Sequence, residues 1–170
     1  MKTIFKFLDK PSNLVILFAL FLFFNFLLIS FISPYQVLDL RFAYSANEAF
    51  KVIKNMGESM RGKYLFVIWA LDSPYMIVYL LLLIGLIRKL WKQKKFLILP
   101  FIIAGLDLFE NIMVSSLLLS FPFESKLLGY FASFFTTTKW LCVGVCVVFL
   151  IVGLVRNYVF RKEPNLDLKR

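Results

Sequence analysis

The sequence predicts an all-α protein, a polytopic bundle of four transmembrane helices with one extracytoplasmic amphipathic helix between the first two. The chain is 61% hydrophobic and 18% aromatic, which is more apolar surface than a water-soluble domain of this length needs. Its apolar stretches are each about 20 residues or longer, enough to cross about 30 Å of hydrocarbon as a helix. An open sheet edge cannot be left unsatisfied in lipid, so all of them are expected to be helices. They cover residues 14–33, 64–87, 96–121 and 128–155 of a single domain, 1–170.

The first span follows Lys2, Lys6 and Lys10, as the core of a secretory signal would. Its apolar run is longer than a signal core, and the following SFISPYQ has no small-x-small cleavage pattern, so we expect a retained anchor. The strongly polar residue within it, Asn25, is expected to make an interhelical hydrogen bond.

The segment between the first two spans contains a predicted amphipathic helix over residues 45–60. Ser45 and Glu48 form the Ser-x-x-Glu pair of a capping box. Apolar residues then recur at helical spacing, at Ala49, Phe50, Ile53, Met56 and Met60. We expect this helix to lie on the outer membrane surface or over the mouth of the bundle, as a shield for the helix ends or as a lid.

The basic residues predict the orientation of the chain. The N-terminus, the 88–95 loop and the tail from residue 156 together carry thirteen basic residues and three acids, whereas the other loops carry six basic residues and four acids. We expect the protein to lie in the inner (plasma) membrane of the cell. The positive-inside rule then predicts that both termini, with the tail 156–170, are cytoplasmic. The net charge of +10 indicates attraction to anionic membrane lipids and requires no nucleic-acid partner.

The second span carries a polar face. At 100° per residue, Arg61, Asp72, Tyr75 and Tyr79 share this face and Tyr64 lies at its edge. Pro74 cannot donate a backbone hydrogen bond, so the helix is expected to bend there.

The third and fourth spans also carry ionisable residues. On the third span, Asp107, Glu110 and Asn111 share a face with small residues, so they are expected to point into the bundle; this face also includes Pro100, Ala104 and Ser115. On the fourth, Lys139 lies on a face with Ala132, Thr136 and Val143. A separate stripe of small residues is suited to close helix contact and comprises Gly129, Ser133, Thr137 and Gly144.

Counting residues from the outer helix ends places Asp72, Asp107, Glu110 and Lys139 in one layer, roughly 12 to 20 Å deep at 1.5 Å per residue. Charged residues at this depth cost at least roughly 2.5 kcal/mol each, so they commonly mark functional sites. A structural network in which Lys139 pairs with Asp107 or Glu110 is the alternative, although a lone structural pair does not need three carboxylates.

The metal-binding and cofactor-binding classes find little support. The chain has no histidine, and Cys142 and Cys146 are spaced unlike a CxxC motif, so we expect no metal site and no cofactor, with both cysteines serving as apolar packing. A divalent cation held by Asp72, Asp107 and Glu110 is a variant, because hard cations prefer oxygen ligands.

The runs GESMRGKYLFVIWALDSPYMIVY, LPFIIAGLDLFEN and FTTTKW contain a Gly-x-x-x-Arg before a Tyr, an Asp close before a Pro, an Asp-x-x-Glu-Asn and a Phe-Thr-x-x-Lys-Trp. These motifs resemble those of small four-helix bacterial membrane proteins of uncharacterised function, where the second motif is Asp-x-x-Pro rather than Asp-Ser-Pro. The resemblance brings no activity, and it covers Arg61, Tyr64, Asp72, Pro74, Asp107, Glu110, Asn111, Thr136, Lys139 and Trp140. A looser likeness, in helix number and buried acids alone, is to the four-helix sterol isomerase and sigma-2 receptor group.

Three functions remain open. The first is binding or transport of a small cationic or amphipathic, lipid-like ligand in a site open to the extracytoplasmic side. The residues of the polar faces and Trp140 would line this site. Transport by so small a protein would require a homodimer. The second is an intramembrane enzyme acting on a lipid or isoprenoid, with Glu110 or Asp107 as general acid and Asp72 as base. The third is an accessory or assembly subunit whose polar layer only specifies helix pairing.

Overall fold

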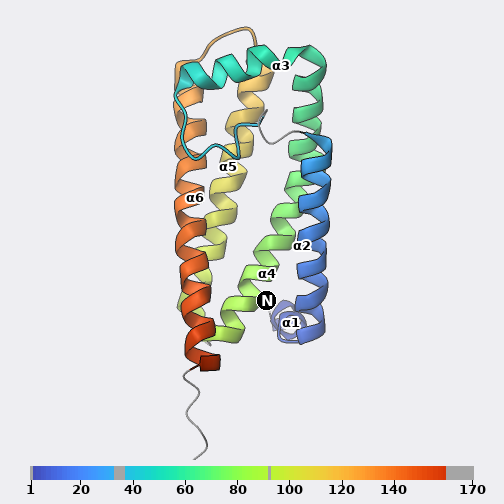
Figure 1. The fold of residues 1–170 in the computed structure, drawn as a ribbon, viewed down its shortest axis with the longest axis vertical. Coiled ribbons are helices and arrows are strands. Elements are labelled where there is room, and N and C mark those ends of the chain that lie inside the picture. The colour runs from blue at the N-terminus through green and yellow to red at the C-terminus, as the bar shows by residue number, and fades with distance from the viewer. Residues whose placement is uncertain (1, 33–36, 92, 160–170) are drawn as a thin grey trace, which may run out of the picture.

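The computed structural model describes residues 2–32, 37–91 and 93–159, and within these ranges every regular element is a helix (Figure 1). The prediction of an all-α chain with four helices long and apolar enough to span a membrane is confirmed. The elements are α1 (Lys2–Leu8), α2 (Pro11–Phe31), α3 (Ala46–Val67), a π-helical turn η2 (Ile68–Asp72), α4 (Ser73–Trp91), a 3-10 turn η3 (Lys94–Leu97), α5 (Ile98–Ser120), α6 (Lys126–Leu154) and a π-helical turn η4 (Val155–Val159). Most of the predicted tail, from residue 160, and Lys92 of the basic loop lie outside the described residues.

Helix α3 has two parts that meet at Gly57. The capping box is present, because the Ser45 hydroxyl accepts from the Glu48 backbone N–H at 3.3 Å while Glu48 Oε2 accepts from the Ser45 N–H at 2.6 Å. Gly57 adopts a φ of 71°, a conformation that side chains with a Cβ disfavour, and it redirects the chain. The first part crosses one end of the bundle and the second turns down along it (Figure 1).

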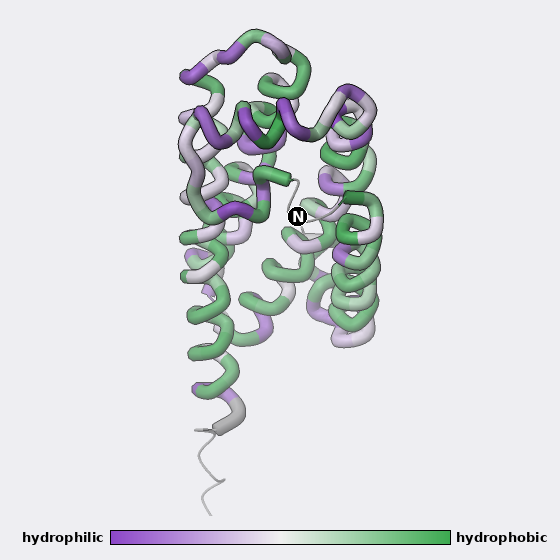
Figure 2. Tube along the Cα trace, turned by 45° about the horizontal axis from the view of Figure 1, so that its top comes forward, coloured by the Kyte–Doolittle hydropathy of each residue, from purple (hydrophilic) through white to green (hydrophobic). Residues whose placement is uncertain are grey.

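The first part of α3 has an apolar side against the bundle and exposed lysines on the other side. Ala49, Phe50 and Ile53 are buried against the bundle, whereas Lys51 and Lys54 are exposed. Figure 2 shows this part as the most hydrophilic stretch of helix, next to spans that are mainly hydrophobic. The helix therefore covers the end of the bundle.

The second span is irregular just before Pro74. Residues Ile68–Asp72 form a π-helical turn, and the Ser73 hydroxyl donates to the Ile68 carbonyl at 3.1 Å. A π turn contains one more residue than an α turn. The side chains before and after it therefore do not keep the register that a continuous α-helix would give them.

Helices α5 and α6 pack along each other and provide the polar wall of the bundle. The predicted inward face of α5 is buried, and its members are Pro100, Ala104, Asp107, Glu110, Asn111 and Ser115. The opposite face, which includes Phe101, Leu108 and Phe109, is exposed, as a helix facing acyl chains should be. One apolar cluster lies at the α3 end of the bundle and another at the α1 end, and the latter includes Cys142 and Cys146, both free thiols.

The small-residue stripe of α6 packs only over part of its length. A Cβ added at Gly129 would lie 2.7 Å from the Ala46 Cβ, so this glycine allows α6 to approach the start of α3. Ser133 accepts from the Tyr44 N–H at 3.2 Å, and Thr137 donates to the Phe42 carbonyl at 2.8 Å. The expectation of close contact was wrong for Gly144, which is exposed with no atom within 4 Å of an added Cβ. Helix α6 extends here beyond α3 and beyond the connector that precedes α3, residues 37–45.

Replacing Gly129 and Gly144 by alanine separates close packing from helix propensity. Gly129→Ala is expected to lower the free energy of unfolding by about 1–3 kcal/mol through overpacking against Ala46. Gly144→Ala meets no neighbour, so it should leave stability unchanged or raise it by up to about 1 kcal/mol. Unfolding of both variants in the same detergent tests this, and equal shifts would contradict the packing.

Candidate functional site

The centre of the bundle contains a buried ion-pair triad. Lys139 Nζ on α6 lies 2.8 Å from Asp107 Oδ1 on α5 and also forms an ion pair with Glu110 Oε2, one helical turn further along α5. All three side chains are buried, with Asp107 5% and Lys139 9% exposed and Glu110 fully buried. These contacts bring together three of the four residues that the sequence predicted to share one layer.

The remaining oxygens of the triad are occupied by hydroxyl groups. Tyr79 on α4 donates to Asp107 Oδ2 at 2.6 Å, and Thr136 on α6 donates to Glu110 Oε1 at 2.6 Å. The Tyr44 hydroxyl lies 3.2 Å from the Thr136 hydroxyl and extends the network to the connector before α3. A buried charge is tolerated only when it is paired and hydrogen-bonded, and both triad carboxylates meet that condition.

Asp72 lies at the end of the π turn and has a different partner. Asn111 Nδ2 on α5 donates to Asp72 Oδ2 at 2.6 Å. Nearby, Asn25 Nδ2 on α2 donates to the Tyr75 hydroxyl at 2.9 Å, which confirms the interhelical bond predicted for Asn25. These two amide contacts tie α2, α4 and α5 together around Asp72.

Asp39 is a further acid at this site that the sequence analysis counted among the outer loops. Its carboxylate accepts a hydrogen bond from Tyr64, and its backbone carbonyl accepts from Trp140 Nε1 at 2.8 Å. The Leu38 N–H donates to the same Tyr64 hydroxyl at 3.1 Å. Burial raises the pKa of Asp39, which belongs to the connector rather than to a span, and the Lys139 ammonium offsets part of that rise. Apolar neighbours of Asp39 at residues 37, 38 and 40 were the available sequence signal of a buried connector.

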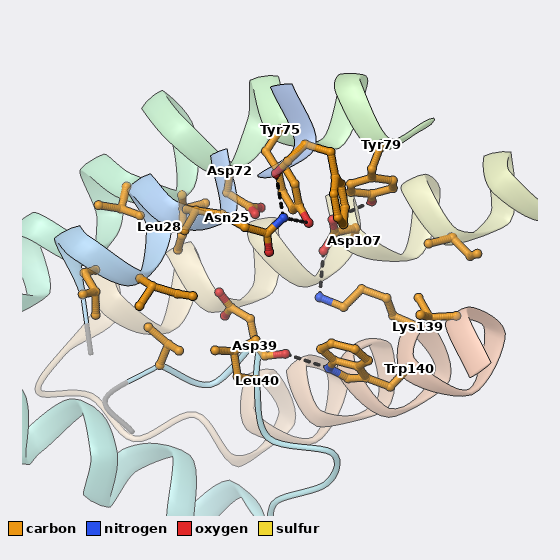
Figure 3. A pocket seen from close by; sticks show the side chains of 18 of the residues that line it. Asn25, Leu28, Asp39, Leu40, Asp72, Tyr75, Tyr79, Asp107, Lys139 and Trp140 are labelled. Atoms are coloured by element: carbon orange, nitrogen blue, oxygen red, sulfur yellow. Dashed lines mark hydrogen bonds and ion pairs between the residues drawn. The ribbon is translucent and has the colours of Figure 1, made fainter. Parts of the chain in front are cut away.

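These residues surround a cavity of about 450 Å³ (Figure 3). Its polar lining consists of Asn25, Asp39, Tyr64, Asp72, Tyr75, Tyr79, Asp107, Lys139 and Trp140, and the rest of the lining is apolar. Figure 3 shows Asp39 on the opposite side of this space from Asp72, and Lys139 joined to Asp107 beside it. The size and the mainly apolar wall with convergent polar groups are those of a small-molecule binding site.

The cavity carries an imbalance of charge. Of the described residues that line it, Lys139 alone is basic, and it is shared by Asp107 and Glu110. Within the part of the chain that the structure describes, neither Asp39 nor Asp72 has a salt-bridge partner. Each accepts a hydrogen bond from a neutral donor instead, so two carboxylates border the cavity with no cation paired to them.

The structure places most of the predicted site residues at this cavity or directly behind it. Three others lie behind the lining: Glu110 pairs with Lys139, Asn111 donates to Asp72, and Thr136 donates to Glu110. Arg61 is the exception, because its guanidinium lies 4.0 Å from the Phe121 ring centroid and donates to the Ile53 carbonyl at 3.4 Å. The π turn between Arg61 and Asp72 breaks the shared helical face on which its assignment to the site depended.

A metal centre finds no support in the described residues. Among residues 2–32, 37–91 and 93–159, no three acidic or thiol side chains converge in a way that could hold a metal ion. The grouping of Asp72, Asp107 and Glu110 around a divalent cation is therefore not favoured.

Comparison of the chain with protein-family models, with curated proteins and with solved structures finds no match. The site is accordingly interpreted from its own geometry.

Removing the shared ammonium should strongly destabilise the protein. Lys139→Met leaves the buried carboxylates of Asp107 and Glu110 uncompensated, which costs about 3–5 kcal/mol of stability. The double variant Lys139→Met/Glu110→Gln should recover part of the loss, because one of the two charges is then absent. Unfolding midpoints in one detergent provide the comparison, with Lys126→Met at the exposed start of α6 as the control. A Lys139→Met protein as stable as this control would show that the triad does not hold the bundle together.

Proposed function

We propose that this chain is an integral membrane protein that binds an amphipathic ligand with a cationic, ammonium-like headgroup in the cavity between α2, α4, α5 and α6. The observation that carries the proposal is the pair of carboxylates, Asp39 and Asp72, that line the cavity without a salt-bridge partner among the described residues. A carboxylate held away from water without a counter-charge is costly, and a bound cation removes that cost.

The aromatic lining supports the same headgroup. Tyr64, Tyr75, Tyr79 and Trp140 all border the cavity, and the Tyr75 and Tyr79 rings meet edge to face at 5.4 Å. Aromatic faces attract cations, and aromatic cages are the usual means of recognising quaternary ammonium groups. Carboxylates together with aromatic rings therefore favour an ammonium over an anionic headgroup.

The remaining lining supports an apolar tail. Phe21, Leu83, Val143 and Val147 continue the cavity beyond the polar residues and offer no hydrogen-bonding side chain. Burial of alkyl surface contributes about 25 cal/mol per Å² of apolar area to the free energy of binding. A ligand with both a cationic head and an apolar chain would use both parts of the wall.

The alternative functions are less well supported by the same contacts. A general acid must reach the substrate, yet Glu110 is fully buried behind the lining, and Asp107 is already bound to Lys139 and Tyr79. The triad does fit a structural role, so the assembly hypothesis describes Lys139, Asp107 and Glu110 but leaves Asp39 and Asp72 unexplained.

We propose that the protein lies in the inner membrane with both termini in the cytoplasm. Basic residues near the ends of α1, α4 and η3, among them Lys6, Arg88, Lys89 and Lys95, lie at the end of the bundle opposite the first part of α3 (Figure 1). The positive-inside rule makes that end cytoplasmic and the amphipathic start of α3 extracytoplasmic. Anionic lipids are the expected partners of the basic end.

Dodecyltrimethylammonium is a suitable probe because it combines a quaternary ammonium with one alkyl chain. The protein in lipid nanodiscs should bind it saturably, and Asp72→Asn or Asp39→Asn should weaken the affinity by at least about tenfold through loss of the counter-charge. Asparagine keeps an oxygen that can accept from Asn111 or Tyr64, so both variants should retain the unfolding midpoint of the wild type.

Glu124→Gln removes an exposed carboxylate outside the cavity and provides the matched control. Binding that is absent in the wild type, or equal affinities in Asp72→Asn, Asp39→Asn and Glu124→Gln, would contradict the proposed function.

A further inference from the structure

We infer that the ligand moves laterally between the cavity and the bilayer, through an apolar gap between α2 and α6. The ligand is then an ammonium amphiphile with an alkyl chain, dissolved in the membrane, and not a water-soluble cation. The inference rests on the proposed function and adds to it the route and the class of ligand. It replaces the expectation of a site open to the extracytoplasmic side.

The cavity is covered at the α3 end. Of the described residues, the lining there includes Ile32, Val37, Tyr64, Val67 and Ile68, and each of these is no more than 8% exposed. The connector that carries Val37 is fastened across the bundle by the bond from Trp140 to the Asp39 carbonyl and by the bond from the Leu38 N–H to Tyr64. A ligand from the water beyond α3 would have to displace this packed layer.

On the flank between α2 and α6, residues that line the cavity are also exposed on the surface of the protein. Ile29 on α2, Leu40 in the connector and Val147 on α6 line the cavity, yet they are 60%, 52% and 48% exposed on the surface of the protein. These side chains therefore mark where the interior of the cavity reaches the outer surface. All of them are apolar, which suits a mouth that faces acyl chains rather than water.

The packing of the helices explains why this flank is open. Helix α2 packs mainly against α4, whereas α6 packs mainly against α5. Figure 1 shows α2 and α6 at opposite edges of the bundle, with α4 and α5 between them. Both helices line the cavity over several turns, from Phe21 to Ile29 on α2 and from Lys139 to Val147 on α6, so the cavity itself runs lengthwise along these helices.

The length of the cavity fits a chain lying parallel to the helices. From Asp72, which would hold the headgroup, the lining continues along α4 to Leu83, 83 − 72 = 11 residues further, or roughly 16 Å at 1.5 Å per residue. The carboxylates of Asp39 and Asp72 would hold the ammonium, and the alkyl chain would extend towards Leu83 and Val147, beside the gap. A ligand without an alkyl chain would leave Leu83 and Val147 with no apolar group to pack against.

Narrowing the gap tests the route independently of the site. Val147→Phe adds bulk at the gap, whereas Val148→Phe adds the same bulk at the next residue, which is 61% exposed and does not line the cavity. In nanodiscs, labelled dodecyltrimethylammonium should dissociate about tenfold more slowly from Val147→Phe than from wild type, because a narrowed passage raises the barrier to exchange. Val148→Phe should behave as wild type. Ile29→Phe, with Val15→Phe as its control on the lipid-exposed side of α2, repeats the test on the other wall.

The chain of the ligand is tested with tetramethylammonium, which has the same headgroup. It should fail to displace the labelled amphiphile at concentrations where unlabelled dodecyltrimethylammonium displaces it fully. If binding depends on Asp72 but Val147→Phe and Ile29→Phe exchange as fast as their controls, or if tetramethylammonium competes equally well, the lateral route is overturned while the proposed function stands. If no variant and no wild-type protein binds either probe saturably, both proposals fail.

Discussion

The structure depends on the shared contact of one ammonium with two carboxylates at the centre of the helical bundle. Lys139 on α6 is held between Asp107 and Glu110, which follow one another on the inward face of α5. In a medium without water, such charges are tolerated only together, so the triad fixes the rotation and the height of α6 against α5. Tyr79 and Thr136 complete the hydrogen bonding and join α4 to the same point.

The triad also determines which acids have no cation partner. Because Lys139 is already shared by two acids, it does not neutralise Asp72 from the π turn or Asp39 from the connector, and both face the cavity. Two apolar clusters, one at each end of the bundle, keep this polar layer between them. The acids on α5 are therefore paired with Lys139 of α6, whereas Asp39 and Asp72 at the cavity have no salt-bridge partner among the described residues. That asymmetry is the basis for proposing a cationic ligand.

Helical periodicity was enough to predict the spans and the inward faces of α5 and α6, because the rise and rotation per residue of an α-helix are fixed. It was not enough for Asp39, whose connector has no regular period and reaches the cavity only through contacts with Tyr64 and Trp140. It failed for Arg61 because the π turn changes the helical register, and for Gly144 because the extent of contact between α6 and its neighbours is a tertiary property. The existence of the cavity depends on such tertiary packing throughout.

The central claim is that Asp39 and Asp72, left unpaired by the triad, hold a cation inside the bundle. An experimental density map of the protein in lipid nanodiscs with dodecyltrimethylammonium tests this most directly. The account predicts headgroup density between the carboxylates of Asp39 and Asp72, beside Tyr75 and Trp140, with the chain extending towards Val147. A map in which Asp39 lies outside the bundle, or in which the amphiphile occupies only the outer surface of the helices, would contradict it.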